Sequence, residues 1–433
     1  MIRRDALREY SRGSLWLLPV VAVLVSVGLG AVLSRIDVSP ASLLAFQGTA
    51  DDARNLLIGI SSTMVTVIAL LLGLAVVALQ LSSTQFSPRL LRNFLRDRPN
   101  QIVLAVFVGT FGYSAAGLFE VGVSGGERVT EFPRFAVTVA VGLLFLSLGL
   151  LVFFADHLAH SIQVDQVLHV VERNTLEVIT KLPTRGEPTP LPPSDAHVVA
   201  ASASGYIQVV YVAELLRTAV AQRVHIRLRP RVGEHVVAGS PLAWAWPVGD
   251  DRPGLADGAS RGIDATVTDA VRIGFERTLE QDPGLGMRQL CDAACKALSP
   301  AINHPYTAIQ AVEHLTVLYA ALATQPPGEI VGRAQGCVVA IPTRSFAEHL
   351  ALGVGLIRRY GAAEPTVVTA LLRLLEATLE ACGRAPEQRA PIAEQADLLV
   401  SAATREVAEP ADLALVHAQR AILDASLEAR PAP

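Results

Sequence analysis

Four long apolar stretches near the start of the chain constrain its fold more than any other feature of the sequence. A helix needs roughly 20 apolar residues to cross the hydrocarbon core of a bilayer. Each stretch reaches that length without an Asp, Glu, Lys or Arg, and no comparable stretch follows residue 156. The stretches are 14–34, 56–88, 99–119 and 135–155. We therefore predict that residues 1–160 form a membrane domain of four transmembrane helices.

The composition agrees with a membrane protein that has a sizeable soluble part. Hydrophobic residues make up 51% of the chain and charged residues 18%, whereas soluble domains carry about 25% charged residues. This excludes a disordered chain and a basic nucleic-acid-binding protein, so we expect the lipid bilayer as a partner and no nucleic acid. The cysteines begin only at Cys291, far from the apolar stretches, and we expect buried, reduced thiols in a cytoplasmic domain.

The placement of arginine predicts the orientation in the membrane. Arginines crowd the N-terminal tail and the segment that follows the second apolar stretch, whereas the two other connections mix arginine with acidic residues. The crowded positions are Arg3, Arg4, Arg8, Arg12, Arg89, Arg92, Arg96 and Arg98. Because basic loops stay on the cytoplasmic side, we expect both termini in the cytoplasm. The preference for Arg over Lys, with abundant Ala and Val, is typical of a GC-rich bacterial genome and places the chain in a bacterial inner membrane.

The second apolar stretch differs from the others because a polar stripe follows one face of the predicted helix. The stripe consists of Thr63, Thr66, Gly73, Gln80 and Thr84, which recur at helical spacing. Hydroxyl, amide and glycine positions are disfavoured against lipid, and they either let a second helix approach closely or line a water-filled path. The pattern favours packing against another helix of the same chain, and it leaves open a homo-oligomeric contact or a solute path. No charge lies within the stretches, so a proton-coupled core lacks its usual residues.

The fold class that we predict is an α-helical membrane domain of four transmembrane helices followed by a cytoplasmic α+β domain. The cytoplasmic part divides into a helical stem with a Pro-rich linker over 161–194, a small β-rich unit over 195–250 and a mainly α-helical domain over 251–433. Strands are predicted at 198–200, 206–210, 224–228, 236–237 and 337–341, with a short helix at 212–222. Amphipathic helices are predicted at 263–273, 287–298, 306–321, 345–359, 366–381, 386–402 and 411–427.

Two irregular segments of the cytoplasmic part are rich in side chains that form hydrogen bonds. They contribute Arg277, Thr278, Gln281 and Asp282 on one side and Ser299, Asn303, His304 and Thr307 on the other. We expect the two segments to meet, with Arg277 pairing with Asp282 or capping the turn before His304. The alternative is a ligand or subunit-contact site, in which Arg277 binds an anion. We expect no cofactor and no metal site, because Cys291 and Cys295 share a helix face but offer too few ligands.

Several strings of residues in this chain are long and unusual. They are Ser61-Ser62-Thr63-Met64, Gln80-Leu81-Ser82-Ser83-Thr84-Gln85-Phe86-Ser87-Pro88-Arg89, Ser204-Gly205-Tyr206-Ile207-Gln208 and Ala297-Leu298-Ser299-Pro300-Ala301-Ile302-Asn303. On these strings the chain resembles the bacterial membrane-protein family catalogued as domain of unknown function 2254. The resemblance covers nearly the whole chain and implies no particular activity. It also implies an Asp before Pro305, where this chain has His304.

Three classes of function remain open at this point. The first is a homo-oligomeric channel- or transporter-like protein with a cytoplasmic regulatory domain and a small ion or an anionic ligand as a partner. The second is a membrane-anchored ligand sensor or scaffold without transport, which the uncharged apolar stretches favour. The third is a membrane-bound enzyme with Arg277, Asp282, Asn303 and His304 as polar candidates. Because the sequence contains no P-loop, HExxH or GxSxG motif, we expect no enzymatic activity.

The predicted orientation can be tested with reporter fusions. Alkaline phosphatase, active only outside the cytoplasm, is expected to be active when fused after Gly125 and inactive when fused after Lys181, because the arginine distribution puts these points on opposite sides. A green fluorescent protein fused at the same two positions is expected to show the inverse pattern. A cytoplasmic signal at Gly125 would contradict the four-span topology.

Overall fold

The computed structural model describes the protein as two compact units, Met1–Gln166 and Val167–Pro433. The described residues are 16–36, 42, 45–85, 98–121, 132–161, 163–182, 185–186, 189, 191–249, 257–326, 328–383 and 386–429. The arginine-rich segments 1–15 and 86–97 lie outside this description, as does the loop that contains Gly125.

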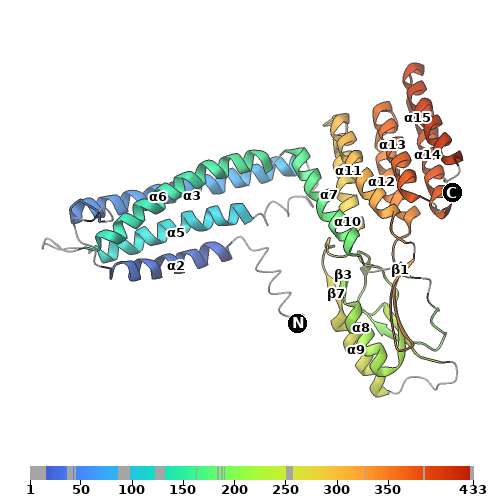
Figure 1. Ribbon diagram of the computed structural model, residues 1–433, viewed down its shortest axis with the longest axis horizontal. Coiled ribbons are helices and arrows are strands. Elements are labelled where there is room, and N and C mark those ends of the chain that lie inside the picture. The colour runs from blue at the N-terminus through green and yellow to red at the C-terminus, as the bar shows by residue number, and fades with distance from the viewer. Residues whose placement is uncertain are drawn as a thin grey trace. The chain divides into compact units, whose positions relative to one another are not determined.

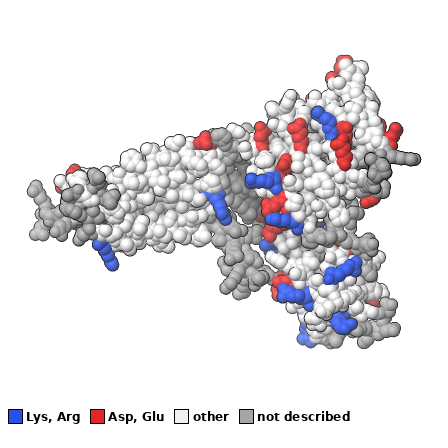
Figure 2. Space-filling model, viewed as in Figure 1, with Lys and Arg blue, Asp and Glu red and all other residues white. Residues whose placement is uncertain are grey.

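The N-terminal unit consists of apolar helices that lie side by side (Figure 1). They are α2 (Leu17–Leu33), α3 (Ala50–Gln85), α5 (Arg98–Glu120) and α6 (Arg134–Ser161). Among the described residues, three helices are long and apolar enough to cross a membrane, over Ala50–Val77, Arg98–Phe119 and Arg134–Leu158. The first predicted span is present as α2, which at 17 residues is shorter. Figure 2 shows that the visible face of this unit carries few charged side chains.

Helix α5 is the centre of this unit, since it packs against α2, α3 and α6. Two of its polar side chains find partners on α6: the hydroxyls of Thr110 and Ser147 lie 3.1 Å apart, and Tyr113 donates a hydrogen bond of 3.0 Å to the carbonyl of Ala136. In a bilayer such groups cannot bond to water, so pairing between helices holds α5 and α6 in one register.

The strands of the C-terminal unit, as far as the chain is described, form a six-stranded sheet in the order β1-β8-β9-β4-β6-β2 and a three-stranded sheet in the order β5-β3-β7. Only β4 and β9 pair in parallel. Helices α8 (Val212–Gln222) and α9 (Asp257–Ala270) pack against the strands. The strands are β1 (Arg185–Gly186), β2 (His197–Ala200), β3 (Gly205–Val210), β4 (Val224–Leu228), β5 (His235–Val236), β6 (Pro241–Pro247), β7 (Val271–Gly274), β8 (Glu329–Ala334) and β9 (Cys337–Ile341).

The sheets extend beyond the predicted β-rich unit at 195–250. The hairpin β8–β9 comes from the range expected to be mainly helical, and β1 comes from the expected linker. Two residues with positive φ, Gln335 at 49° and Gly336 at 80°, make the tight hairpin turn. The parallel pairing of Ile226 with Val339 joins strands more than a hundred residues apart, which no local periodicity can show. Residues 195–250 therefore do not form a separate unit.

The rest of the C-terminal unit is an array of paired helices in two rows, α10-α12-α14 and α11-α13-α15 (Figure 1). The helices are α10 (Pro283–Ala297), α11 (Pro305–Ala323), α12 (Phe346–Gly361), α13 (Pro365–Cys382), α14 (Pro386–Glu406) and α15 (Pro410–Glu428). All but α12 begin with proline, whose fixed φ suits the first turn and whose missing N–H costs nothing there. Helix α12 begins instead with a capping box between Ser345 and Glu348.

Helix α7 (Val164–Lys181) packs onto the helical array through a close contact at a glycine. Its buried face consists of Leu168, Val171, Thr175 and Ile179. A Cβ atom on Gly286 of α10 would lie 1.8 Å from the Thr175 hydroxyl oxygen and 2.8 Å from Cβ of Thr175. Only glycine allows the two backbones to approach this closely.

We expect Gly286→Ala to lower the free energy of unfolding by about 1–3 kcal/mol, because the new methyl group overlaps Thr175 and pushes α7 away from α10. Gly355→Ala is the matched control: Gly355 lies inside α12, and a Cβ there has nothing within 4 Å. Alanine at that position is expected to add up to about 1 kcal/mol through helix propensity. Thermal unfolding of the purified protein in detergent measures both, and equal effects would contradict the close contact.

Candidate functional site

The polar stripe on α3 faces away from the other helices of its unit. Thr63, Thr66, Gly73 and Gln80 are exposed, and the side chain of Thr84 lies outside the described part of the chain. The buried residues of the same helix include Ala53, Leu57, Ile60, Met64 and Leu71. With 100° between successive residues, the stripe and the buried face point in largely opposite directions.

No other helix of this chain covers the stripe in the described structure. A Cβ atom at Gly73 would meet no described atom within 4 Å. Thr66 donates its hydroxyl back to the carbonyl of Ser62 on its own helix, at 3.1 Å. The prediction that the stripe packs inside the chain is therefore wrong, because α3 uses its other face for that purpose.

The second candidate site is a buried ion pair at the start of α10. The Arg277 Nε donates to Oδ2 of Asp282 at 2.8 Å, and Nη2 lies 2.6 Å from the same oxygen. This confirms the predicted pairing. Asp282 is only 5% exposed, and burial raises the pKa of its carboxyl although Arg277 opposes the rise. A Cβ on Gly233 would lie 2.1 Å from Oδ2 of Asp282, so the β4–β5 loop passes directly over the carboxylate.

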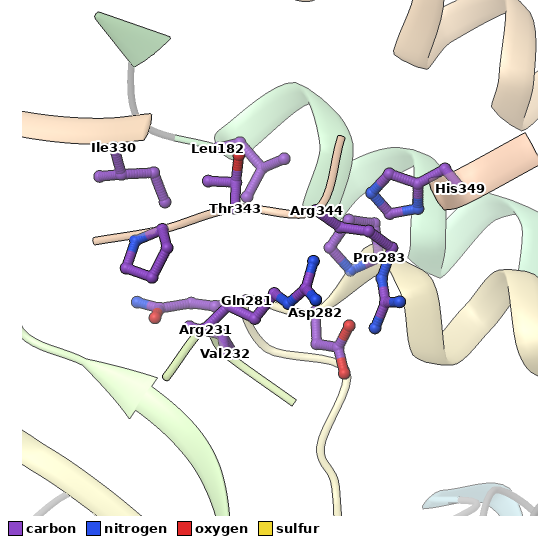
Figure 3. Close-up of a pocket in the computed structure, with 11 residues that line it drawn as sticks. Leu182, Arg231, Val232, Gln281, Asp282, Pro283, Ile330, Thr343, Arg344 and His349 are labelled. Carbon is purple, nitrogen blue, oxygen red and sulfur yellow. The ribbon is translucent and has the colours of Figure 1, made fainter. Parts of the chain in front are cut away.

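Further charged side chains converge on Asp282 from distant parts of the unit. Figure 3 shows the side chains of Arg231 and Arg344 pointing toward Asp282 across a small cavity of about 40 Å³, enough for a few water molecules. Arg231 makes two hydrogen bonds of 2.8 Å to the carboxylate of Glu348. Burial raises the pKa of Glu348, but the hydrogen bonds from Ser345 and Arg231 outweigh it and lower the pKa to about 2.

Arg344 borders both this cavity and a larger hollow. Burial, reinforced by repulsion from Arg231, lowers the pKa of Arg344, although Asp282 and Glu348 oppose the fall. The neighbouring hollow has a volume of about 350 Å³ and includes the first turn of α12 and Gln388 of α14. Gln388 is 4% exposed, and its Oε1 has no hydrogen-bond partner among the described residues. Glu329 and Glu387 also line the hollow, so a ligand held there would be small and polar, with any anionic group placed at Arg344.

Of two further residues of the predicted patch, Gln281 and Thr278, the structure gives a local bonding role only to Gln281. Gln281 bonds to the backbone of β3, accepting from the Val210 N–H at 2.9 Å and donating to its carbonyl at 3.3 Å. The hydroxyl of Thr278 is buried and has no partner among the described residues. Gln281 thus attaches the segment before α10 to the three-stranded sheet.

The other half of the predicted patch lies at the far end of α10. A helix of 15 residues is about 22 Å long, so the prediction that the two segments meet is wrong. Ser299 bonds to the Lys296 carbonyl at 2.7 Å, and Asn303 adopts a φ of 46°. His304 is the N-cap of α11: its Nδ1 accepts from the Thr307 N–H at 3.3 Å and lies 2.8 Å from the Thr307 hydroxyl. These residues close a turn between two helices.

Sequence reasoning missed Arg231, Arg344 and Glu348 because each lies in a different segment from Asp282. Their only local signal is the capping box at Ser345, which marks a helix start and not a site. What the arrangement can do chemically follows from its charges: Arg277 pairs with Asp282 and Arg231 with Glu348, and the third guanidinium group, that of Arg344, could face an anion.

The two ends of α10 should respond differently to substitution. Arg277→Ala is expected to lower the free energy of unfolding by about 1–3 kcal/mol, because it leaves the buried Asp282 carboxylate with a weakened set of partners. His304→Asp is expected to keep the stability or raise it slightly, since Asp is a stronger N-cap than His. Arg359→Ala, at an exposed position of α12, is the control. Chemical unfolding followed by intrinsic fluorescence measures all three, and a harmless Arg277→Ala would contradict the structural role of the ion pair.

Comparison with known proteins agrees with the apolar N-terminal unit. The family model described as predicted membrane protein (DUF2254) matches residues 12–377. Uncharacterized protein Rv1290c of Mycobacterium tuberculosis and uncharacterized protein Mb1321c of Mycobacterium bovis are each 43% identical over 429 residues, covering 96% of this chain and 81% of theirs. No solved structure matches the chain.

Proposed function

The chain belongs to the DUF2254 family of predicted membrane proteins, and we propose that it is a homo-oligomeric channel- or transporter-like protein of the bacterial inner membrane. In this proposal α2 crosses the membrane with the three longer helices, both termini are cytoplasmic, and the unit 167–433 is a regulatory domain. One observation supports the proposal above all others: the polar stripe of α3 is exposed on the surface of its own unit.

The energetic argument starts from the cost of polar groups against lipid. Thr66 satisfies its hydroxyl within its own helix, but Gly73 leaves bare backbone that gains nothing from contact with lipid tails. Small and hydroxyl-bearing residues favour close helix contacts. A second copy of α3 supplies such a contact, and closed symmetry places identical stripes around one axis. Oxygen-lined positions around that axis would suit a small ion or a polar solute.

The C-terminal unit supports a regulatory role through the hollow beside Arg344. A volume of about 350 Å³ falls within the range of small-molecule sites, roughly 300–1,000 Å³. This feature also favours the second candidate function, a membrane-anchored sensor of an anionic ligand without transport. The proposal includes no enzymatic activity, because Asp282 and His304, both weighed for catalysis, lie at opposite ends of α10.

Substitution at Gly73 tests the oligomer. Because the described structure has room for a side chain at this position, Gly73→Leu should leave the fold of a single chain intact. It should weaken association by about tenfold or more, since a lost close helix contact costs about 1–2 kcal/mol. Leu72→Phe, also exposed but on another face of α3, is the matched control. Light scattering of the full-length protein in detergent, over a range of concentrations, measures both variants.

Two further measurements decide between the candidate functions. Thr66→Cys is expected to cross-link between chains on oxidation, and the parent chain supplies the background because its cysteines lie in the other unit. Conductance in a planar bilayer bathed in KCl then tests for a path. An oligomer that conducts, and loses conductance with Gly73→Leu, supports a channel. An oligomer without conductance supports the sensor, and a monomer that does not cross-link at Thr66 overturns the proposed assembly.

A further inference from the structure

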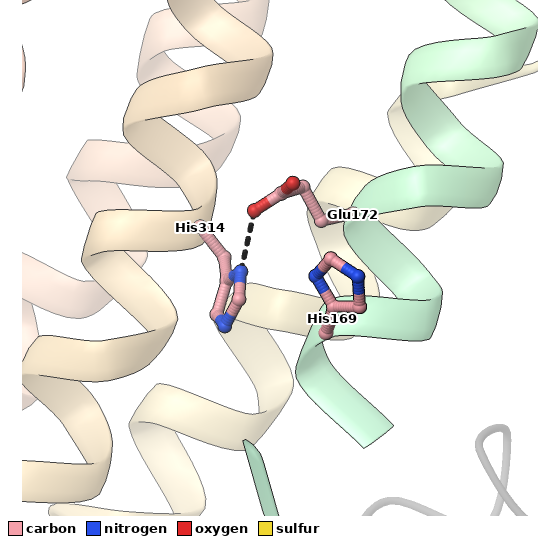
Figure 4. A group of neighbouring side chains, drawn as sticks. All are labelled: His169, Glu172 and His314. Carbon is pink, nitrogen blue, oxygen red and sulfur yellow. Dashed lines mark hydrogen bonds and ion pairs between the residues drawn. The ribbon is translucent and has the colours of Figure 1, made fainter. Parts of the chain in front are cut away.

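A group of metal-ligating side chains lies between two helices of the C-terminal unit, away from the Asp282 cluster. His169 and Glu172 lie on α7 and His314 lies on α11 (Figure 4). Each offers one ligand atom, and these atoms all lie within 4.8 Å of one another. We propose that the three residues bind a divalent transition-metal ion of the zinc class and join α7 to α11.

The sequence places two of the ligands on one helix face. His169 and Glu172 are three residues apart, so they lie one turn apart on the same side of α7. The buried face of α7, which includes Leu168 and Val171, adjoins this side, so the two side chains lie at the edge of the contact with the helical array. Further along α7, the close contact between Thr175 and Gly286 of α10 holds the helix in place. The packing of α7 against the helical array therefore brings His169 and Glu172 close to His314.

The distances between the ligand atoms are close to those that a zinc ion requires. Nδ1 of His314 and Oε2 of Glu172 are 2.5 Å apart, and the rings of His169 and His314 have centroids 6.3 Å apart at an angle of 52°. Tetrahedral ligands at about 2.0–2.1 Å from zinc lie about 3.3 Å from one another. All three ligand atoms already lie within 4.8 Å of one another, so the site requires only small adjustments of the side chains.

The ligand types select the class of metal. Two imidazoles and one carboxylate suit zinc, cobalt, nickel or iron, whereas calcium and magnesium require a shell made almost entirely of oxygen. His169 is exposed and Glu172 and His314 are partly exposed, so an ion can enter from solvent and a water molecule can complete the coordination. Three protein ligands with one open position is a common arrangement for zinc.

A simpler role for the same residues requires only two of them. Glu172 and His314 would then form a hydrogen bond between α7 and α11, and His169 would be a bystander at the surface. The two readings differ in what His169 contributes. The metal site needs His169 as a ligand, whereas the simple hydrogen bond does not involve it.

The test uses the full-length protein in detergent, stripped of metal with a chelator that is then removed by dialysis. Titration with zinc, followed by calorimetry, is expected to show one high-affinity ion per chain, and elemental analysis after desalting is expected to give the same ratio. Cobalt is expected to bind at the same site and to give visible absorption bands. His169→Ala, Glu172→Gln and His314→Ala are each expected to weaken zinc binding by at least about tenfold, since even residues behind the ligands cost that much.

His417→Ala is the matched control, because His417 is an exposed histidine on α15 of the same unit, and it is expected to bind zinc like the native chain. Thermal unfolding of every variant in chelator verifies that it is folded before titration. Zinc should raise the unfolding temperature of the native chain and of His417→Ala but not of His169→Ala. A native chain that binds no zinc overturns the proposal, and so does a His169→Ala variant that binds with native affinity.

Discussion

A polar group that faces hydrocarbon has no water to bond with, and the N-terminal unit is arranged around this constraint. Helices α5 and α6 meet it at two places, because the hydroxyls of Thr110 and Ser147 face each other and Tyr113 reaches a carbonyl on α6. Helix α3 meets it only in part, since Thr66 bonds within its own helix while the rest of the polar stripe faces outward. Among the described helices none covers the stripe of α3, and this is the physical basis for expecting a second copy.

In the C-terminal unit the corresponding constraint is a buried charge, the carboxylate of Asp282. A carboxylate as enclosed as that of Asp282 is tolerated only where cations and a close backbone surround it. Those partners come from the β4–β5 loop, from the segment before α10 and from the segment before α12, so the requirement of one carboxylate brings the sheets and the helical array together. The ion pair between Arg231 and Glu348 adds a second link between the same parts.

The sequence predicted what depends on neighbouring residues and missed what depends on distant ones. Helices α10 to α15 were predicted to within a few residues, because proline marks their starts and amphipathic spacing marks their length. The end of α9 was misplaced: Val271 and Ile273 continue a plausible helical pattern, but β7 begins there because β3 offers a pairing edge. The surroundings of Asp282 and the approach of His314 to Glu172 depend on contacts between segments far apart in the chain. The spacing of residues along the sequence does not predict such contacts.

Helix α7 links these observations in one element. It follows α6, the last of the long apolar helices, with only residues 162 and 163 between them in the chain. Among the described residues, α7 contacts the helical array through one buried face, the close contact at Gly286 and the contact between Glu172 and His314. If α7 exchanges between a packed and an unpacked arrangement, anything that binds one arrangement better shifts the balance by its difference in affinity. A metal ion that joins α7 to α11 would bind the packed arrangement better, since its ligands come together only there. If the C-terminal unit regulates the membrane helices, α7 is the element through which the chain itself connects them.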